Sequence, residues 1–259
     1  MPVITTIEDL RLMAKQRVPK MFYDYADSGS WTEQTYRENT TDFEKVRLRQ
    51  RIAVNMEGRS LASTMVGEDV AMPVALAPTG LTGMQHADGE ILAAKAAEAF
   101  GVPFTLSTMS ICSIEDVVEH TTKPFWFQLY FMRDRDYIER LIKRAHAAGC
   151  SALVVTMDLQ ILGQRHKDVV NGLSAPPKLT LGTMVGMSRR VALWSSLAAL
   201  RAPPCPAAEP QASYDRWSSS YNALDGGEAA SALGLDRLRA EAVGRCSGRV
   251  LEVGVVART

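Results

Sequence analysis

The chain has 259 residues, of which 46% are hydrophobic and 22% charged, the balance of a globular protein that is soluble in water. Lys and Arg together number 29, as do Asp and Glu, so no net field attracts nucleic acid. The four cysteines form no C-x-x-C pair and lie near no histidine at metal-ligand spacing, which indicates reduced cytosolic thiols. Since neither a signal peptide nor a membrane-spanning run is recognised, we expect a cytoplasmic protein; binding at the inner face of the cell membrane stays open.

The first forty residues carry the pattern of three short helices. Thr5 and Glu8 form a capping-box pair ahead of an apolar helical repeat, which predicts the first helix. The second helix is expected at residues 20–26 and the third at residues 32–40, on either side of a Ser-Gly-Ser turn.

A different rhythm begins near residue 72, where short apolar runs alternate with helical patterns. The runs predict four buried strands, at residues 74–77, 104–107, 126–130 and 153–157. The helical patterns between them are residues 90–100, a helix opened by a capping box at Ser113 and Asp116, and residues 135–148. Strand, helix and strand in this order predict βαβ units and a parallel sheet, so the fold class is α/β.

The composition changes after residue 182. Residues 191–259 contain no Lys, Ile, Phe, His or Met, and residues 201–210 hold four prolines, which excludes a regular helix or a central strand there. A helix at 233–243 and a strand at 249–256 are expected. We predict one domain at 1–182 and an irregular C-terminal tail at 183–259 that is foreign to the fold. A frame-shifted or truncated coding sequence, a fragment completed by another chain and a diverged binding module are three open explanations.

Hydrogen-bonding side chains close each predicted strand. They are Thr79, Ser107, Thr108, Gln128, Tyr130, Thr156 and Asp158. In a parallel β/α architecture the ligand binds at the carboxyl ends of the strands. A single such residue is more simply interpreted as a strand-end cap, but four strands that all end this way favour a binding site. Because most of these side chains are neutral, they suit a planar heterocyclic cofactor better than a metal ion.

Five separated blocks of sequence occur in one order. They are MFYDY at 21–25, APTG at 77–80, LST at 106–108, WFQLY at 126–130, and TMD through LGQR at 156–165. In this order and spacing the chain resembles the FMN-dependent α-hydroxy-acid dehydrogenases and oxidases, most closely their bacterial L-lactate dehydrogenase (cytochrome) branch, over about residues 1–182. The resemblance implies a (β/α)8 TIM barrel with extra N-terminal helices, of which this chain would hold a part, about four βα units.

The resemblance assigns roles in substrate binding and catalysis. Tyr25 would donate a hydrogen bond to the substrate carboxylate, and Arg165 would contact the substrate region. Tyr130 would face the substrate hydroxyl group, and Asp158 would orient a catalytic histidine. Taken alone, Tyr25 is more simply a helix-packing tyrosine and Arg165 a solvated loop cation.

The resemblance also implies FMN as cofactor and names the residues beside it. The flavin would lie along Ala77, Pro78 and Thr79, and its ring would receive hydrogen bonds from Ser107, Gln128 and Thr156. The implied reaction is the two-electron oxidation of an L-2-hydroxy acid, L-lactate to pyruvate, with glycolate or mandelate as alternatives. The sequence does not distinguish quinone, cytochrome or oxygen as electron acceptor, and a homo-oligomer is compatible with the resemblance.

Several parts of the family's catalytic machinery have no counterpart in this sequence. They are the Ser-Asn-His-Gly block with the catalytic base, a lysine beside the flavin, a second arginine for the carboxylate and an Asp-Gly-Gly-x-Arg phosphate loop. None of the four histidines matches the base, and His120 and His146 are expected on helix surfaces. We therefore expect this chain to be inactive on its own and to retain FMN weakly. The alternative function is a non-catalytic half-barrel that binds a flavin or a partner.

Overall fold

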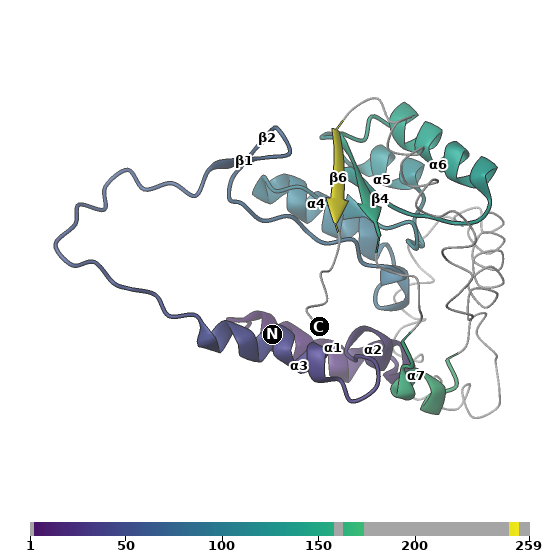
Figure 1. Ribbon diagram of the computed structural model, residues 1–259, viewed down its shortest axis with the longest axis horizontal. Coiled ribbons are helices and arrows are strands. Elements are labelled where there is room, and N and C mark those ends of the chain that lie inside the picture. The colour runs from purple at the N-terminus through teal and green to yellow at the C-terminus, as the bar shows by residue number, and fades with distance from the viewer. Residues whose placement is uncertain (1–2, 158–162, 174–248, 254–259) are drawn as a thin grey trace. The chain divides into compact units, whose positions relative to one another are not determined.

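The computed structural model describes residues 3–157, 163–173 and 249–253, and the chain divides into two units (Figure 1). The first unit contains the N-terminal residues as far as Ser60, together with the segment that begins at Gly163. The second unit contains the chain from Leu61 to the fifth strand and the strand at 249–253. Within the described residues, no helix is both long enough and apolar enough to cross a membrane.

The first unit is helical. Its elements are α1 (Ile7–Arg17), α2 (Lys20–Ala26), α3 (Gln34–Thr41), the short 3-10 helix η1 (Asp42–Lys45) and α7 (His166–Val170). The predicted capping box of α1 was wrong by one residue: Thr6 is the N-cap and Asp9 its partner. The physical reason is that the carboxylate of Asp9 accepts hydrogen bonds from the backbone N–H groups of both Thr5 and Thr6, at 2.8 and 2.9 Å. Glu8 instead pairs with Arg11.

Asp27, which follows α2, links three parts of the first unit. Its carboxylate accepts hydrogen bonds from the hydroxyl groups of Tyr23 and Tyr36, each at 2.5 Å, and pairs with Arg11 at 2.8 Å. Burial would raise the pKa of Asp27, but these three donors outweigh it and lower the pKa below its usual value. Asp27 thereby joins α1, α2 and α3.

The second unit is built on a parallel sheet. The strands are β3 (Thr105–Leu106), β4 (Trp126–Tyr130), β5 (Ala152–Thr156) and β6 (Arg249–Val253), and they lie in that order. Trp126 pairs with Ala152 and Tyr130 with Thr156, so β4 and β5 end level with each other. The predicted parallel βαβ arrangement is therefore confirmed. The predicted strand at 249–256 is present as β6, whereas the predicted helix at 233–243 lies outside the described residues.

Three helices supply the core of the second unit: α4 (Gly89–Phe100), α5 (Ile114–His120) and α6 (Arg135–Ala147). The apolar face of α6 buries Ile138, Leu141 and Ala145. These residues join one cluster with side chains of α4, α5, β3 and β4, in which Leu106 and Leu129 have no exposed surface. The predicted capping box of Ser113 and Asp116 is confirmed at the start of α5.

The predicted strand at 74–77 is not formed as a strand. Leu76 makes a single parallel bridge to Phe104: its N–H donates to the carbonyl of Pro103 at 2.9 Å, and its carbonyl accepts from the N–H of Thr105 at 3.1 Å. Prolines at 73 and 78 flank the run and cannot donate backbone hydrogen bonds, which limits its pairing. Val74 and Leu76 are 45% and 36% exposed, so the expected burial is also absent.

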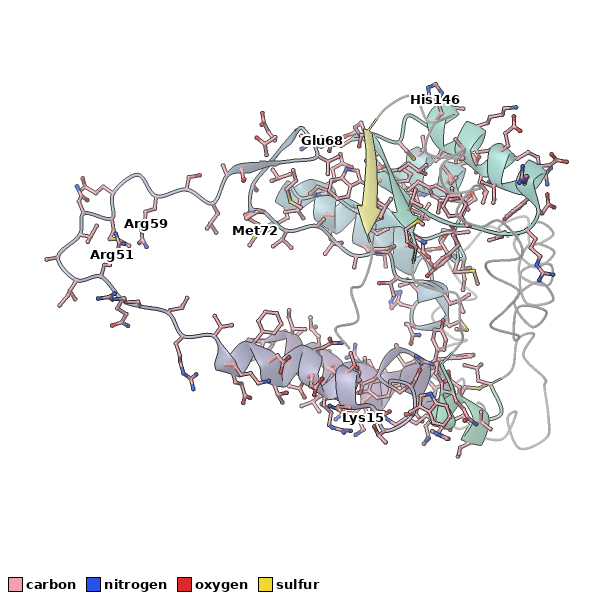
Figure 2. All side chains as sticks on the ribbon, viewed as in Figure 1. Lys15, Arg51, Arg59, Glu68, Met72 and His146 are labelled. Atoms are coloured by element: carbon pink, nitrogen blue, oxygen red, sulfur yellow. The ribbon has the colours of Figure 1, made fainter. Side chains whose placement is uncertain are left out.

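Two features of the chain were not predicted. The first is a short antiparallel hairpin of β1 (Ser63–Met65) and β2 (Glu68–Val70). The second is a long stretch without helix or strand at residues 46–62, which carries the side chains of Arg51 and Arg59 (Figure 2). Its apolar side chains are exposed, Leu48 and Ile52 each to 91%.

Candidate functional site

Four polar side chains meet at the carboxyl ends of β3, β4 and β5, and we call them the strand-end cluster: Ser107, Thr108, Gln128 and Thr156. Gln128 lies at the centre and is only 1% exposed. Its Oε1 accepts hydrogen bonds from Ser107 Oγ and from the backbone N–H of Thr108, both at 3.2 Å. Its Nε2 donates to Thr156 Oγ1 at 2.7 Å. Three of the predicted flavin contacts, Ser107, Gln128 and Thr156, are thus brought together.

The network fixes which way the amide of Gln128 points. The backbone N–H of Thr108 can only donate, so the atom that faces it must be the oxygen, and Nε2 must face Thr156. Nε2 carries two hydrogens, one of which is used by Thr156. Thr156 accepts from Gln128, so its own hydroxyl hydrogen is directed elsewhere. A flavin ring offers carbonyl oxygens and ring nitrogens as acceptors, so the donors of this cluster fit its edge.

Thr108 was predicted as a strand-end residue, but no contact with the flavin or the substrate was assigned to it. Its hydroxyl group donates to the carbonyl of Gln128 at 2.5 Å and accepts from the backbone N–H of Tyr130 at 3.3 Å. Both contacts hold the end of β3 against β4. The signal for this role is the Ser-Thr pair that directly follows an apolar strand. Tyr130 itself is half-buried at the last position of β4.

The loop with Ala77, Pro78 and Thr79 is exposed and runs beside the strand-end cluster. The N–H of Leu81 donates to the carbonyl of Met109 at 2.8 Å. A Cβ atom on Gly80 would lie 3.0 Å from the Cβ of Met109 and 3.8 Å from Ser107 Oγ, so the two loops touch here. The predicted flavin-contact residues Ala77, Pro78 and Thr79 directly precede Gly80, which makes this contact.

A second group of predicted residues lies in the first unit, where Arg165 contacts Tyr25. The guanidinium stands over the ring of Tyr25, 5.1 Å from its centroid, and donates to the backbone carbonyl of Tyr25. It also donates to Ser28 Oγ at 3.1 Å and, through Nε, to the carboxylate of Asp168 at 2.5 Å. Most of its N–H groups are thus engaged with the protein, and the weakest contact is Nη1 to the carbonyl of Ser28 at 3.4 Å.

Tyr25 is half-buried at the C-terminal end of α2. Burial raises the pKa of its phenol, although the positive charge of Arg165 acts in the opposite direction. The phenol therefore stays protonated at neutral pH and can donate a hydrogen bond to an anion. A protonated phenol next to a guanidinium suits a carboxylate ligand.

Asp158 lies outside the described residues. His120 and His146 are exposed on α5 and α6, as predicted. His166 packs its ring against Trp31, with 5.8 Å between centroids. No group of three or more metal-ligating side chains is found in the described part of the chain.

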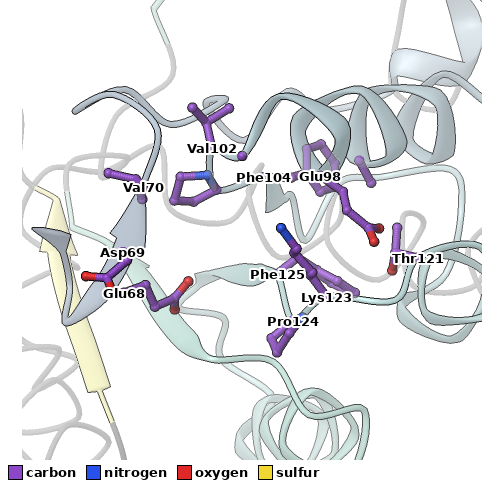
Figure 3. Close-up of a pocket in the computed structure, with 13 residues that line it drawn as sticks. Glu68, Asp69, Val70, Glu98, Val102, Phe104, Thr121, Lys123, Pro124 and Phe125 are labelled. Carbon is purple, nitrogen blue, oxygen red and sulfur yellow. The ribbon is translucent and has the colours of Figure 1, made fainter. Parts of the chain in front are cut away.

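A small pocket lies at the opposite, amino ends of the strands (Figure 3). Glu68, Glu98, Lys123 and Phe125 line it, and it contains none of the predicted site residues. It is a feature of the second unit separate from the strand-end cluster.

A profile of the protein family described as FMN-dependent dehydrogenase matches residues 14–237. The chain belongs to this family. An L-lactate dehydrogenase of Ectopseudomonas mendocina (strain ymp) is 45% identical over 174 residues, which are 67% of this chain and 46% of that protein. The chain thus spans about half the length of this curated relative of the FMN-dependent dehydrogenases.

Solved structures of FMN-dependent dehydrogenase relatives agree with the fold. A crystal structure of (S)-mandelate dehydrogenase, described as a monotopic membrane protein, matches with a TM-score of 0.81 and 28% identity over 98% of this chain and 67% of that one. A mandelate oxidase with benzoyl-formic acid matches with a TM-score of 0.63 and 32% identity over 70% of this chain and 52% of that one. The prediction of a partial TIM-barrel fold is confirmed, and FMN is the cofactor of the family.

Proposed function

We propose that this chain contributes the flavin-ring contacts and part of the substrate contacts to the FMN-dependent oxidation of an L-2-hydroxy acid, with L-lactate as the substrate and pyruvate as the product. The strand-end cluster carries the proposal, because hydrogen bonds join its neutral side chains across three neighbouring parallel strands, toward the carboxyl ends of these strands. The 45% identity to an L-lactate dehydrogenase supports lactate among the 2-hydroxy acids.

FMN, when bound, supplies the two-electron acceptor. Gln128 and Thr156 would donate hydrogen bonds to the edge of its ring, with Ser107 beside them, and Ala77, Pro78 and Thr79 would border it. Tyr130 receives the substrate hydroxyl group at the end of β4. By the family resemblance, Tyr25 would donate to the substrate carboxylate, and Arg165 would add positive charge once its contact with Ser28 is released. By the same resemblance, Asp158 would orient a histidine that takes the hydroxyl proton.

That histidine is not among the 259 residues, which contain no Ser-Asn-His-Gly block. They also contain no Asp-Gly-Gly-x-Arg block that would anchor the FMN phosphate. We therefore expect weak binding of the flavin ring by this chain and no oxidation of L-lactate in the absence of further protein.

Riboflavin, which lacks the phosphate, tests the ring contacts. Titration of the purified chain should quench riboflavin fluorescence, and Gln128→Leu should weaken binding about 10-fold, because it removes three hydrogen bonds of the cluster. Gln34→Leu, an exposed glutamine on α3, is the matched control and should bind like the wild type. Equal riboflavin affinity in the wild type and Gln128→Leu would contradict the assignment of the cluster.

The catalytic part of the proposal is tested by adding the C-terminal half of the E. mendocina relative as a separate polypeptide. In the mixture, we expect L-lactate to bleach FMN under anaerobic conditions, and to do so faster than glycolate or mandelate. The chain alone should show no bleaching. Bleaching by the chain alone would contradict the need for a histidine from elsewhere.

A non-catalytic half-barrel that binds a flavin or a partner is the second candidate. Two observations favour it: most donors of Arg165 are already used within the protein, and Val74 and Leu76 are exposed beside β3. Riboflavin binding by the chain, with no lactate oxidation in the mixture, would identify this function.

Peripheral association with the inner face of the cell membrane is also part of the proposal. The support is one relative that is described as a monotopic membrane protein. Co-sedimentation of the chain with vesicles of anionic lipid tests it, and a chain that stays in the supernatant at low salt contradicts it.

A further inference from the structure

Glu90, near the start of α4, is a buried carboxylate outside the predicted site. Its side chain is 2% exposed. Oε1 accepts a hydrogen bond from the backbone N–H of Ile111 at 3.0 Å, and Oε2 is buried without a hydrogen-bond partner in the described part of the chain. Burying a charged group is costly, so a side chain that does this needs a structural or functional reason.

The loop segment that Glu90 contacts is itself buried at Cys112. The thiol of Cys112, one residue after Ile111, is 8% exposed. Burial, and next the negative charge of Glu90, raise the pKa of the Cys112 thiol to about 12, so the thiol stays protonated at neutral pH. Glu90 lies in the first turn of α4, where the helix dipole stabilises a negative charge.

The segment held by Glu90 is the loop that leaves β3, residues 107–112. This loop begins at Ser107, whose Oγ accepts from the N–H of Met109 at 3.0 Å. In the middle of the loop, the carbonyl of Met109 accepts the hydrogen bond from the N–H of Leu81. Its far end packs on the neighbouring loop, where a Cβ on Gly83 would lie 2.8 Å from the Cδ1 of Ile111. A shift of Ile111 would therefore move both loops that border the strand-end cluster.

We propose that Glu90 is a positioning residue, which holds Ile111 and thereby sets Met109 and Ser107 against the loop of Thr79 at the edge of the flavin ring. This inference rests on the proposed function for its consequence in flavin binding. We call the hydrogen bond from Ile111 to Glu90, together with the contacts of residues 107–112 to the neighbouring loop, the clamp. The clamp does not depend on flavin binding. The side chain of Glu90 acts only through this loop and does not touch the strand-end cluster in the described contacts.

Amide hydrogen exchange of the full chain tests the clamp. In Glu90→Ala, exchange at Ile111 and Met109 should become about 10- to 100-fold faster, as expected for the loss of a hydrogen bond to a charged acceptor. Exchange at Leu129 and Val154, in the centre of the sheet, should not change. Glu90→Gln keeps an oxygen acceptor and should restore the slow exchange. Riboflavin affinity should fall about 10-fold in Glu90→Ala and recover in Glu90→Gln.

Glu98→Ala is the matched control. Glu98 lies on the same helix and also accepts from a backbone N–H, that of Thr122 at 3.0 Å, but at the opposite end of α4. It should speed exchange at Thr122 and leave Ile111 and riboflavin affinity unchanged.

Unchanged exchange at Ile111 in Glu90→Ala, or an equal increase at Leu129 and Val154, would overturn the positioning role. The exchange measurement needs no flavin. A wild-type chain that does not bind riboflavin therefore contradicts the proposed function and not the clamp.

Discussion

Asp27 and Tyr36 show how a single carboxylate changes the titration of a neighbour. The hydrogen bond to Asp27 is the main reason that the pKa of Tyr36 is raised, from 10.0 to about 12, and burial adds to it. A phenol with a raised pKa stabilises the fold while it stays protonated. This contribution is complete below pH 10 and is lost as the pH rises toward about 12.

Spectrophotometric titration of the tyrosines tests this coupling. One of the seven tyrosines should ionise near pH 12 in the wild type, and Tyr36→Phe should remove that step. Asp27→Asn should move the step toward pH 10, because the amide carries no negative charge. A step near pH 12 that persists in Tyr36→Phe would assign it to another residue.

At the residue scale, the sequence predicted which strand-end side chains lie together better than it predicted the contacts of single residues. Ser107, Gln128 and Thr156 could be grouped in advance because strand ends in a parallel sheet are neighbours. The engagement of Arg165 with Ser28 and Asp168 could not, since it depends on how α7 meets the loop after α2. Glu90 gave no signal either, because Glu in the first turn of a helix is usually a solvated residue.

At the scale of elements, α5 depends on its N-cap. Ser113 accepts from the N–H of Asp116 at 3.1 Å, and the carboxylate of Asp116 accepts from the N–H of Ser113 at 2.8 Å. Ser113→Ala should destabilise the chain by about 1 kcal/mol, a typical cost of losing such a cap. Urea unfolding monitored by circular dichroism measures this, and Ser113→Thr should retain most of the stability. A loss as large in Ser113→Thr would point to packing instead of capping.

The elements that the sequence predicted well have both an apolar period and a defined end. Residues 20–26 and 126–130 match α2 and β4, and α6 ends one residue before the predicted 148. Capping boxes are ambiguous where two candidate caps are adjacent, as with Thr5 and Thr6. The run at 74–77 has the composition of a strand but lacks a second partner in the described residues. The hairpin of β1 and β2 is too short to show a period.

At the scale of the whole chain, the stretch at 46–62 is the described segment most open to a protease. It has no helix or strand and contains Arg47, Arg49, Arg51 and Arg59. Among the described residues, trypsin should cut here before it cuts in α6, because cleavage needs an extended, accessible backbone. Mass spectrometry of brief digests identifies the sites. Earlier cleavage after Arg140 or Arg144 would show that α6 opens more readily than this stretch.

The pairing of β5 with β6 has a consequence for the timing of folding. β4 and β5 follow each other closely, whereas β6 begins at Arg249, far along the chain from Thr156. The loop-closure entropy rises by roughly 0.6 kcal/mol for each doubling of loop length, so this contact raises the contact order and forms late. On a ribosome that adds about 5–20 residues per second, β5 waits on the order of 5–20 s for its neighbour. During synthesis, the unpaired edge of β5 is thus a natural binding target for chaperones.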